Sequence, residues 1–74
     1  MTGRVLSWDT GKRWGWIRPH AGPKDCFVHF ADLVDVTELQ RGQTVEFTPL
    51  MNAPRGPRAV DVHVLEPVPA EARR

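Results

Sequence analysis

The chain has 74 residues, one cysteine and a formal net charge of +1. This length supports one small domain and excludes a second core or a deep cleft between domains, and the charge excludes a strongly basic coat protein. One cysteine excludes an intramolecular disulfide, and the sequence shows neither a secretory signal nor an apolar run near the roughly 18 residues of a membrane span, so we expect a cytoplasmic protein.

The predicted elements are short strands separated by turn residues, a pattern typical of an all-β barrel or sandwich. We expect strands over about 3–8, 15–18, 26–29, 44–48 and 58–65, with one helical turn at 30–33. Pro19, Pro49 and Pro67 are expected to end strands, because proline has no backbone donor. Closing the five strands into a barrel removes the exposed sheet edges, which so small a domain could not otherwise cover. The prediction is an all-β fold, a five-stranded antiparallel barrel over 1–66, with a disordered tail over 67–74.

Two aromatic segments, residues 12–17 and 26–30, separate large rings from small side chains. Successive side chains leave a strand on opposite faces. One face then carries Trp14, Trp16, Phe27 and His29, and the other carries Gly15, Ile17, Cys26 and Val28. An ordinary core would not segregate rings in this way, so we expect the aliphatic face inside and the rings outside.

Outward rings beside Lys12 and Arg13 suit the stacking of unpaired bases, with the cations near phosphates. The alternative is that the rings form the core; alternation argues against it because Ile17 and Val28 already supply an inward set. Trp8 is also expected to face outward, although packing over the barrel end stays open.

Arg18 and Arg58 remain open between phosphate contact and a solvated surface charge. The acidic residues between 32 and 38 are expected to be solvated and to repel nucleic acid from that side.

Other chemistries find little support in the sequence. Cys26 and His29 have a metal-like spacing, but their odd offset sends them to opposite faces of a strand, so we expect no shared metal. Cys26 is expected to be a small core residue. Ser7 has no evident base partner. We expect no enzyme and no cofactor.

Residues 3–64 resemble the cold-shock domain family. The resemblance is carried by Lys12-Arg13-Trp14-Gly15-Trp16-Ile17 and Cys26-Phe27-Val28-His29-Phe30, which are similar to the family's two aromatic motifs in order and separation. It implies an OB-type barrel that binds single-stranded RNA and DNA. It also implies base-stacking and contact roles for Lys12, Trp14, Trp16, Phe27, His29 and Phe30, and a loop contact for Arg55.

The chain departs from the family pattern at several points. Ser7-Trp8 stands where the family usually has tryptophan then phenylalanine, and Arg13 replaces a glycine, which leaves the turn geometry open. The connector over 34–38 is short and has no phenylalanine. We therefore expect a shortened or altered footprint.

The resemblance predicts an RNA chaperone or cold-shock-type regulator of transcription or translation. We expect it to act as a monomer and without ATP. The candidate nucleic-acid-binding residues are Trp8, Lys12, Arg13, Trp14, Trp16, Phe27, His29, Phe30 and Arg55. The alternative is a protein-interaction module, for instance on transcription machinery, because rings with arginine also form protein hot spots.

Overall fold

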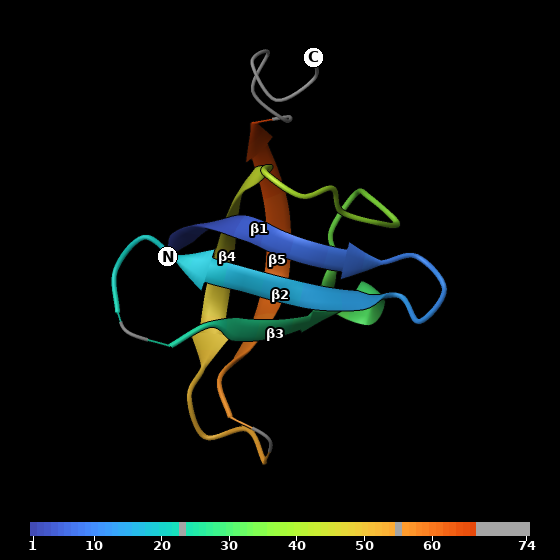
Figure 1. The fold of residues 1–74 in the computed structure, drawn as a ribbon. Helices are drawn as coiled ribbons and strands as arrows, with labels where there is room; N and C mark the ends of the chain where they lie inside the picture. Colours follow the sequence, from blue (N-terminus) through green and yellow to red (C-terminus); the bar gives the residue numbers. More distant parts are fainter. Residues whose placement is uncertain (23, 55, 67–74) are drawn as a thin grey trace.

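The computed structural model describes residues 1–22, 24–54 and 56–66. Its elements are β1 (Thr2–Asp9), β2 (Trp14–Pro19), β3 (Cys26–His29), the 3₁₀ turn η1 (Phe30–Asp32), β4 (Thr44–Leu50) and β5 (Arg58–Glu66). The strands close in the order β1-β2-β3-β5-β4. In Figure 1, β1, β2 and β3 cross in front of β4 and β5. The predicted five-stranded all-β barrel is confirmed; the predicted tail, 67–74, lies outside the described residues.

One of the five pairings is parallel, so the barrel is mixed rather than purely antiparallel. β3 pairs with β5 in parallel at Phe27 and Arg58, while the other neighbours are antiparallel. A closed ring with an odd number of strands cannot alternate direction throughout, because the last strand returns beside one that runs the same way. Closure of five strands therefore requires the parallel pair.

The core is mostly aliphatic, with one aromatic residue, Phe47, and comes from the inward faces of all five strands and the connector before β4. Its buried hydrophobic residues are Val5, Ile17, Cys26, Val28, Leu39, Val45, Phe47, Ala59 and Val62. Along β2, burial alternates strictly, with Gly15 and Ile17 inside and Trp14 and Trp16 outside. The predicted orientation of this strand is therefore confirmed.

Strand β5 does not alternate regularly. Strict alternation would place Val60 and Val62 on one face and Ala59 on the other, but Ala59 and Val62 are both buried. The register with β4 shifts around Phe47, and Asp61 has φ 51°. An extra residue in a β-bulge turns the following side chain to the other face, and aspartate tolerates the left-handed backbone better than most residues.

Strand β4 also runs further than expected. It continues through Pro49 to Leu50, with Pro49 opposite Ala59. β4 pairs with β1 only through residues 44–46. Pro49 therefore lies where β4 has one pairing neighbour, a position at which a missing N–H is tolerated. Within the described residues, no helix is long and apolar enough to cross a membrane.

Candidate nucleic-acid interface

The outward rings of β2, β3 and η1 form one surface, called here the aromatic platform. Its members are Trp14, Trp16, Phe27, His29 and Phe30. The β2–β3 register places Trp14 opposite His29 and Trp16 opposite Phe27. Trp14, Trp16 and Phe30 are 37%, 44% and 39% exposed, high fractions for rings of this size. The structure thus brings together five residues that the sequence analysis named as candidates for base contact.

Edge contacts order the platform. Phe27 lies between the two indoles, 5.3 Å from Trp14 at 82° and 5.7 Å from Trp16 at 75° between ring planes. His29 and Phe30 are 4.8 Å apart. Edge-to-face pairs of this kind stabilise by about 0.5–1.5 kcal/mol each. They therefore hold the rings in place while substantial ring surface stays open to solvent.

Cations border the platform at the start of β2. The Lys12 Nζ lies 5.7 Å from the Trp14 ring centroid, and the Arg13 guanidinium carbon lies 5.2 Å from that of Phe30. These are cation–π distances. Both side chains are exposed, so the same charges are available to a phosphate that approaches the rings.

The turn before β2 positions these cations. The Asp9 carboxylate accepts hydrogen bonds from the Gly11 and Lys12 amides at 2.9 and 3.0 Å. The Arg13 amide donates to the Asp9 carbonyl at 2.7 Å, and the Arg13 carbonyl accepts from the Phe30 amide at 3.0 Å. Arg13 has φ 62°, in the left-handed region that glycine adopts most easily. Arginine is thus held in a glycine-type conformation.

His29 has a structural as well as a surface role. Its Nδ1 accepts a hydrogen bond from the Ala31 amide at 3.3 Å and so caps η1. With Nδ1 as acceptor, the neutral ring carries its proton on Nε2. His29 therefore couples the end of β3 to the position of Phe30 and offers one donor at the platform.

Trp8 is not part of the platform. It is half-buried and packs against the core, whereas the sequence analysis expected it outside. The β1–β2 register slips between Val5 and Ser7, so that Ser7 faces Trp16 and Trp8 faces the inward Gly15. The bulge therefore exchanges the faces of Ser7 and Trp8, and it leaves the Trp8 Nε1 buried with no hydrogen-bond partner among the described residues.

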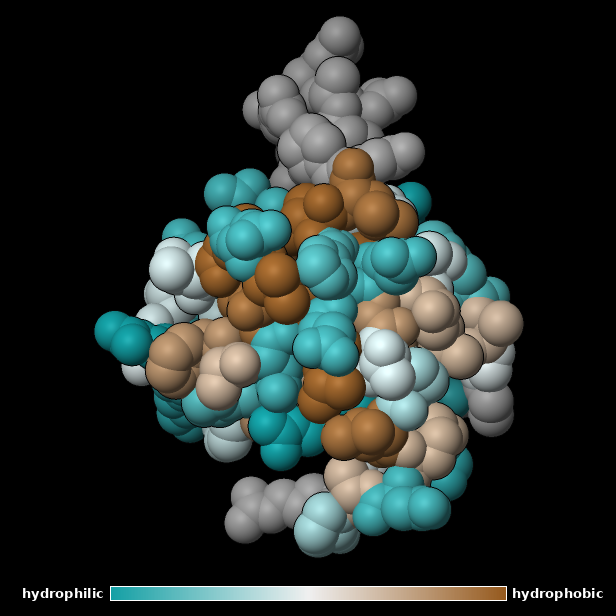
Figure 2. Space-filling model, turned by 180° about the vertical axis from the view of Figure 1, so that it is seen from behind, coloured by the Kyte–Doolittle hydropathy of each residue, from teal (hydrophilic) through white to brown (hydrophobic). Residues whose placement is uncertain are grey.

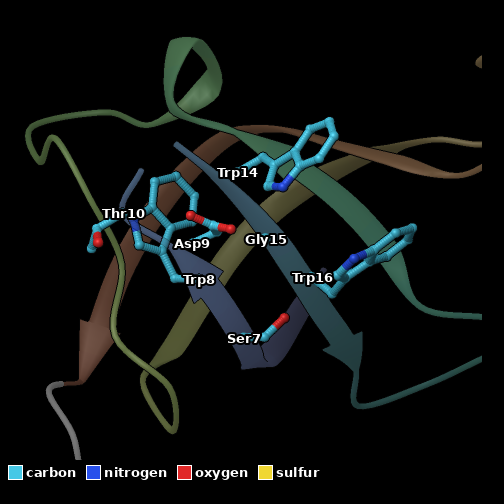
Figure 3. Close-up of a pocket in the computed structure, with 7 residues that line it drawn as sticks. All are labelled: Ser7, Trp8, Asp9, Thr10, Trp14, Gly15 and Trp16. Atoms are coloured by element: carbon cyan, nitrogen blue, oxygen red, sulfur yellow. The ribbon is translucent and has the colours of Figure 1, made fainter. Parts of the chain in front are cut away.

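A hollow of about 530 Å³ beside the two platform indoles follows from this exchange. It is lined by Ser7, Trp8, Asp9, Thr10, Trp14, Gly15 and Trp16. Figure 3 shows Trp14 and Trp16 projecting on one side of β2 and Trp8 on the other. A Cβ on Gly15 would lie 2.1 Å from the Ser7 carbonyl oxygen, so the strands approach too closely for any other residue. Sequence reasoning missed Ser7, whose outward position depends on the bulge.

The structure tests the expected role of Arg58 but not that of Arg55. Arg58 donates from Nε and Nη2 to the Asp32 carboxylate at 2.9 and 2.6 Å. Since Asp32 follows β3 and Arg58 begins β5, this ion pair reinforces the short parallel seam, which favours a structural role for Arg58. Arg55 lies outside the described residues, so its predicted loop contact stays a prediction.

Cys26 and His29 lie on opposite faces of β3, as the odd offset required. Cys26 is buried and His29 half-buried on the outer face. Burial raises the pKa of the Cys26 thiol, with a smaller contribution from the Asp25 carboxylate. A buried thiol that stays protonated is a poor nucleophile and a poor metal ligand.

Comparison with known proteins matches most of this chain to one family. Residues 1–65 match the model described as the "Cold-shock" DNA-binding domain. The chain is 45% identical over 67 residues to cold shock-like protein CspB of Yersinia pestis, covering 88% of this chain and 94% of that protein. It is 43% identical to CspI of Escherichia coli K12, with the same coverage. It is 36% identical over 66 residues to cold shock-like protein CspA of Bordetella pertussis, covering 86% of this chain and 97% of that protein. On the profile match and these relatives, the chain belongs to the cold-shock domain family.

Proposed function

We propose that this protein binds single-stranded nucleic acid by stacking unpaired bases on the aromatic platform. The observation that carries the proposal is the row of rings outside a barrel whose core is already filled by other side chains, most of them aliphatic. Bases in a duplex have their faces covered by neighbouring pairs, so exposed rings favour unpaired bases. Membership of the cold-shock domain family supports the same function.

The mechanism requires no catalysis. Capture of unpaired bases on Trp14, Trp16 and Phe27 competes with base pairing, so weak hairpins open by mass action. We infer that the protein is not an enzyme and acts as an RNA chaperone or cold-shock-type regulator of transcription or translation. A single buried cysteine suits a reducing compartment, which supports a cytoplasmic location.

The expected affinity is moderate. Each base–aromatic contact contributes roughly 1–3 kcal/mol, and the cost of association must be subtracted from the sum. Three or four contacts sum to about 3–12 kcal/mol before that cost, so micromolar binding, about −8 kcal/mol, requires the upper part of this range together with the phosphate contacts. The net charge of +1 predicts a shallower salt dependence than that of strongly basic proteins.

A protein-interaction module remains the rival function. Exposed hydrophobic residues do occur away from the platform, among them Leu50, Met51 and Leu65. On the face opposite the platform, however, hydrophobic side chains are interspersed with hydrophilic ones (Figure 2). A mixed surface of this kind favours the platform as the main binding face.

Tryptophan fluorescence tests the proposed function, because two platform rings are indoles. Titration with a pyrimidine-rich oligonucleotide should quench the emission, since stacked bases contact Trp14 and Trp16 directly. The same sequence in a duplex is the control and should quench much less. Absence of quenching by the single strand at tens of micromolar contradicts the proposal, and retention of a nuclease-insensitive protein partner would favour the rival.

A further inference from the structure

A second group of cations lies on the outer face of the barrel, at the end of β2 away from Lys12. The outward residues of β2 are Trp14, Trp16 and Arg18, in that order. The β1–β2 register places Arg4 directly opposite Arg18, and both side chains are exposed. A line of rings therefore leads to a cross-strand pair of arginines, called here the arginine pair.

The arginine pair is only partly neutralised by the protein. Like charges directly opposite each other on neighbouring strands are unfavourable. Arg18 donates from Nε to the Asp25 carboxylate at 3.2 Å, and its side chain is still 67% exposed. Arg4 makes no ion pair within the described ranges; Glu46, which faces Thr2 across β1 and β4, is its nearest carboxylate by register. An anion that bridges both guanidinium groups would remove the repulsion.

The surface between the arginines is hollowed. Arg4, Leu6, Arg18, Pro19 and His20 line a depression of about 550 Å³. Its His20 wall is tied to β1, because the His20 amide donates to the Thr2 carbonyl at 3.0 Å and the Thr2 Oγ1 lies 3.0 Å from the His20 Nδ1. Strand pairing and these bonds fix the backbone under the depression, so its cations project from a rigid base.

We propose that the arginine pair is a phosphate site for the nucleic-acid strand as it leaves the platform past Trp16. Arg18 follows Trp16 by two positions on the same face of β2, a separation of about 7 Å along the strand. Guanidinium groups present several donors in a planar fork that matches phosphate oxygens. With Nε of Arg18 held by Asp25, its terminal nitrogens remain for the ligand. This site rests on the proposed function and lengthens its footprint.

Oligonucleotides of different length distinguish the arginine pair from the aromatic platform, because only a longer strand can reach both. Binding of oligothymidylates of about four and about nine nucleotides should be measured at several salt concentrations for the wild type and for Arg4→Gln and Arg18→Gln. Arg4→Gln is the cleaner variant, because Arg4 forms no ion pair with the side chains that the structure describes, whereas Arg18 does. Each change should weaken the longer oligonucleotide by roughly twofold to fivefold, the range of an exposed ion pair, and leave the shorter one unchanged. The slope of log K against log salt should fall by about 0.7 for each lost phosphate contact.

Arg41→Gln is the matched control, because Arg41 is an exposed arginine in the turn before β4. Thermal melting checks that every variant is folded. The proposal is overturned if Arg41→Gln weakens the longer oligonucleotide as much as Arg4→Gln does, since the effect would then reflect net charge alone. It is also overturned if the short and long oligonucleotides lose affinity equally. Failure of the wild type to bind either oligonucleotide overturns the proposed function itself.

Discussion

The two faces of β2 show how one strand divides stability from binding. Gly15 and Ile17 point inward and are buried, whereas Trp14 and Trp16, their immediate neighbours, are exposed on the platform. The backbone is shared, so the difference depends only on which way each side chain leaves the strand. Substitutions on the inner face should therefore lower the free energy of unfolding, and those on the outer face should lower the affinity for nucleic acid.

The largest effect is expected from Ile17→Ala, on the inner face. Ile17 has no exposed surface, and truncation of a buried isoleucine lowers the free energy of unfolding by about 2–5 kcal/mol. Urea unfolding measures the loss, and Ile17→Val, expected to cost about 0.5–1.5 kcal/mol, provides a graded control. The folded fraction should bind an oligonucleotide as tightly as the wild type does. A stability loss below that of Ile17→Val would contradict the assignment of Ile17 to the core.

On the outer face, Trp16→Ala should weaken oligonucleotide binding by about 1–3 kcal/mol, one stacking contact. The free energy of unfolding should change by less than about 1 kcal/mol, because the ring is 44% exposed and loses mainly its edge contact with Phe27. Fluorescence titration, which still reports through Trp14, measures the first quantity and thermal melting the second. A large drop in melting temperature with unchanged affinity would show that the ring is a core residue.

The smallest effect is expected from a substitution in the turn that connects β1 to β2. Arg13→Gly should raise the free energy of unfolding by roughly 0.5–1 kcal/mol, because glycine adopts the left-handed backbone without strain. The same change removes the cation beside Phe30 and should weaken oligonucleotide binding by roughly twofold to fivefold. Arg13→Asn, which also tolerates this conformation, is the control for chain entropy. A destabilised Arg13→Gly would contradict the assignment of strain to this position.

Much of the fold and platform was predictable from side-chain alternation. The period of two identified β2 and β3 and placed Trp14, Trp16, Phe27 and His29 on one face, because these strands pair without interruption. Alternation failed at the register shifts in β1 and β5. Bulges depend on how two strands pair, which neither strand's own sequence specifies.

Contacts between residues far apart in the sequence could not be predicted from side-chain alternation either. The pairing of Arg58 with Asp32 and the meeting of Arg4 with Arg18 follow from closure and register. A closed ring of five strands requires one parallel pair, but the strand count does not say that β3 and β5 form it.

The short parallel seam joins binding to the integrity of the barrel. Phe27 belongs to the platform, yet its amide donates to the Pro57 carbonyl at 2.9 Å and its backbone pairs with Arg58 across the seam. Transient opening there would displace the central ring of the platform. A bound nucleic-acid strand that stacks on Phe27 would oppose this transient opening. Ligand binding should therefore slow hydrogen exchange at the seam and raise the free energy of unfolding.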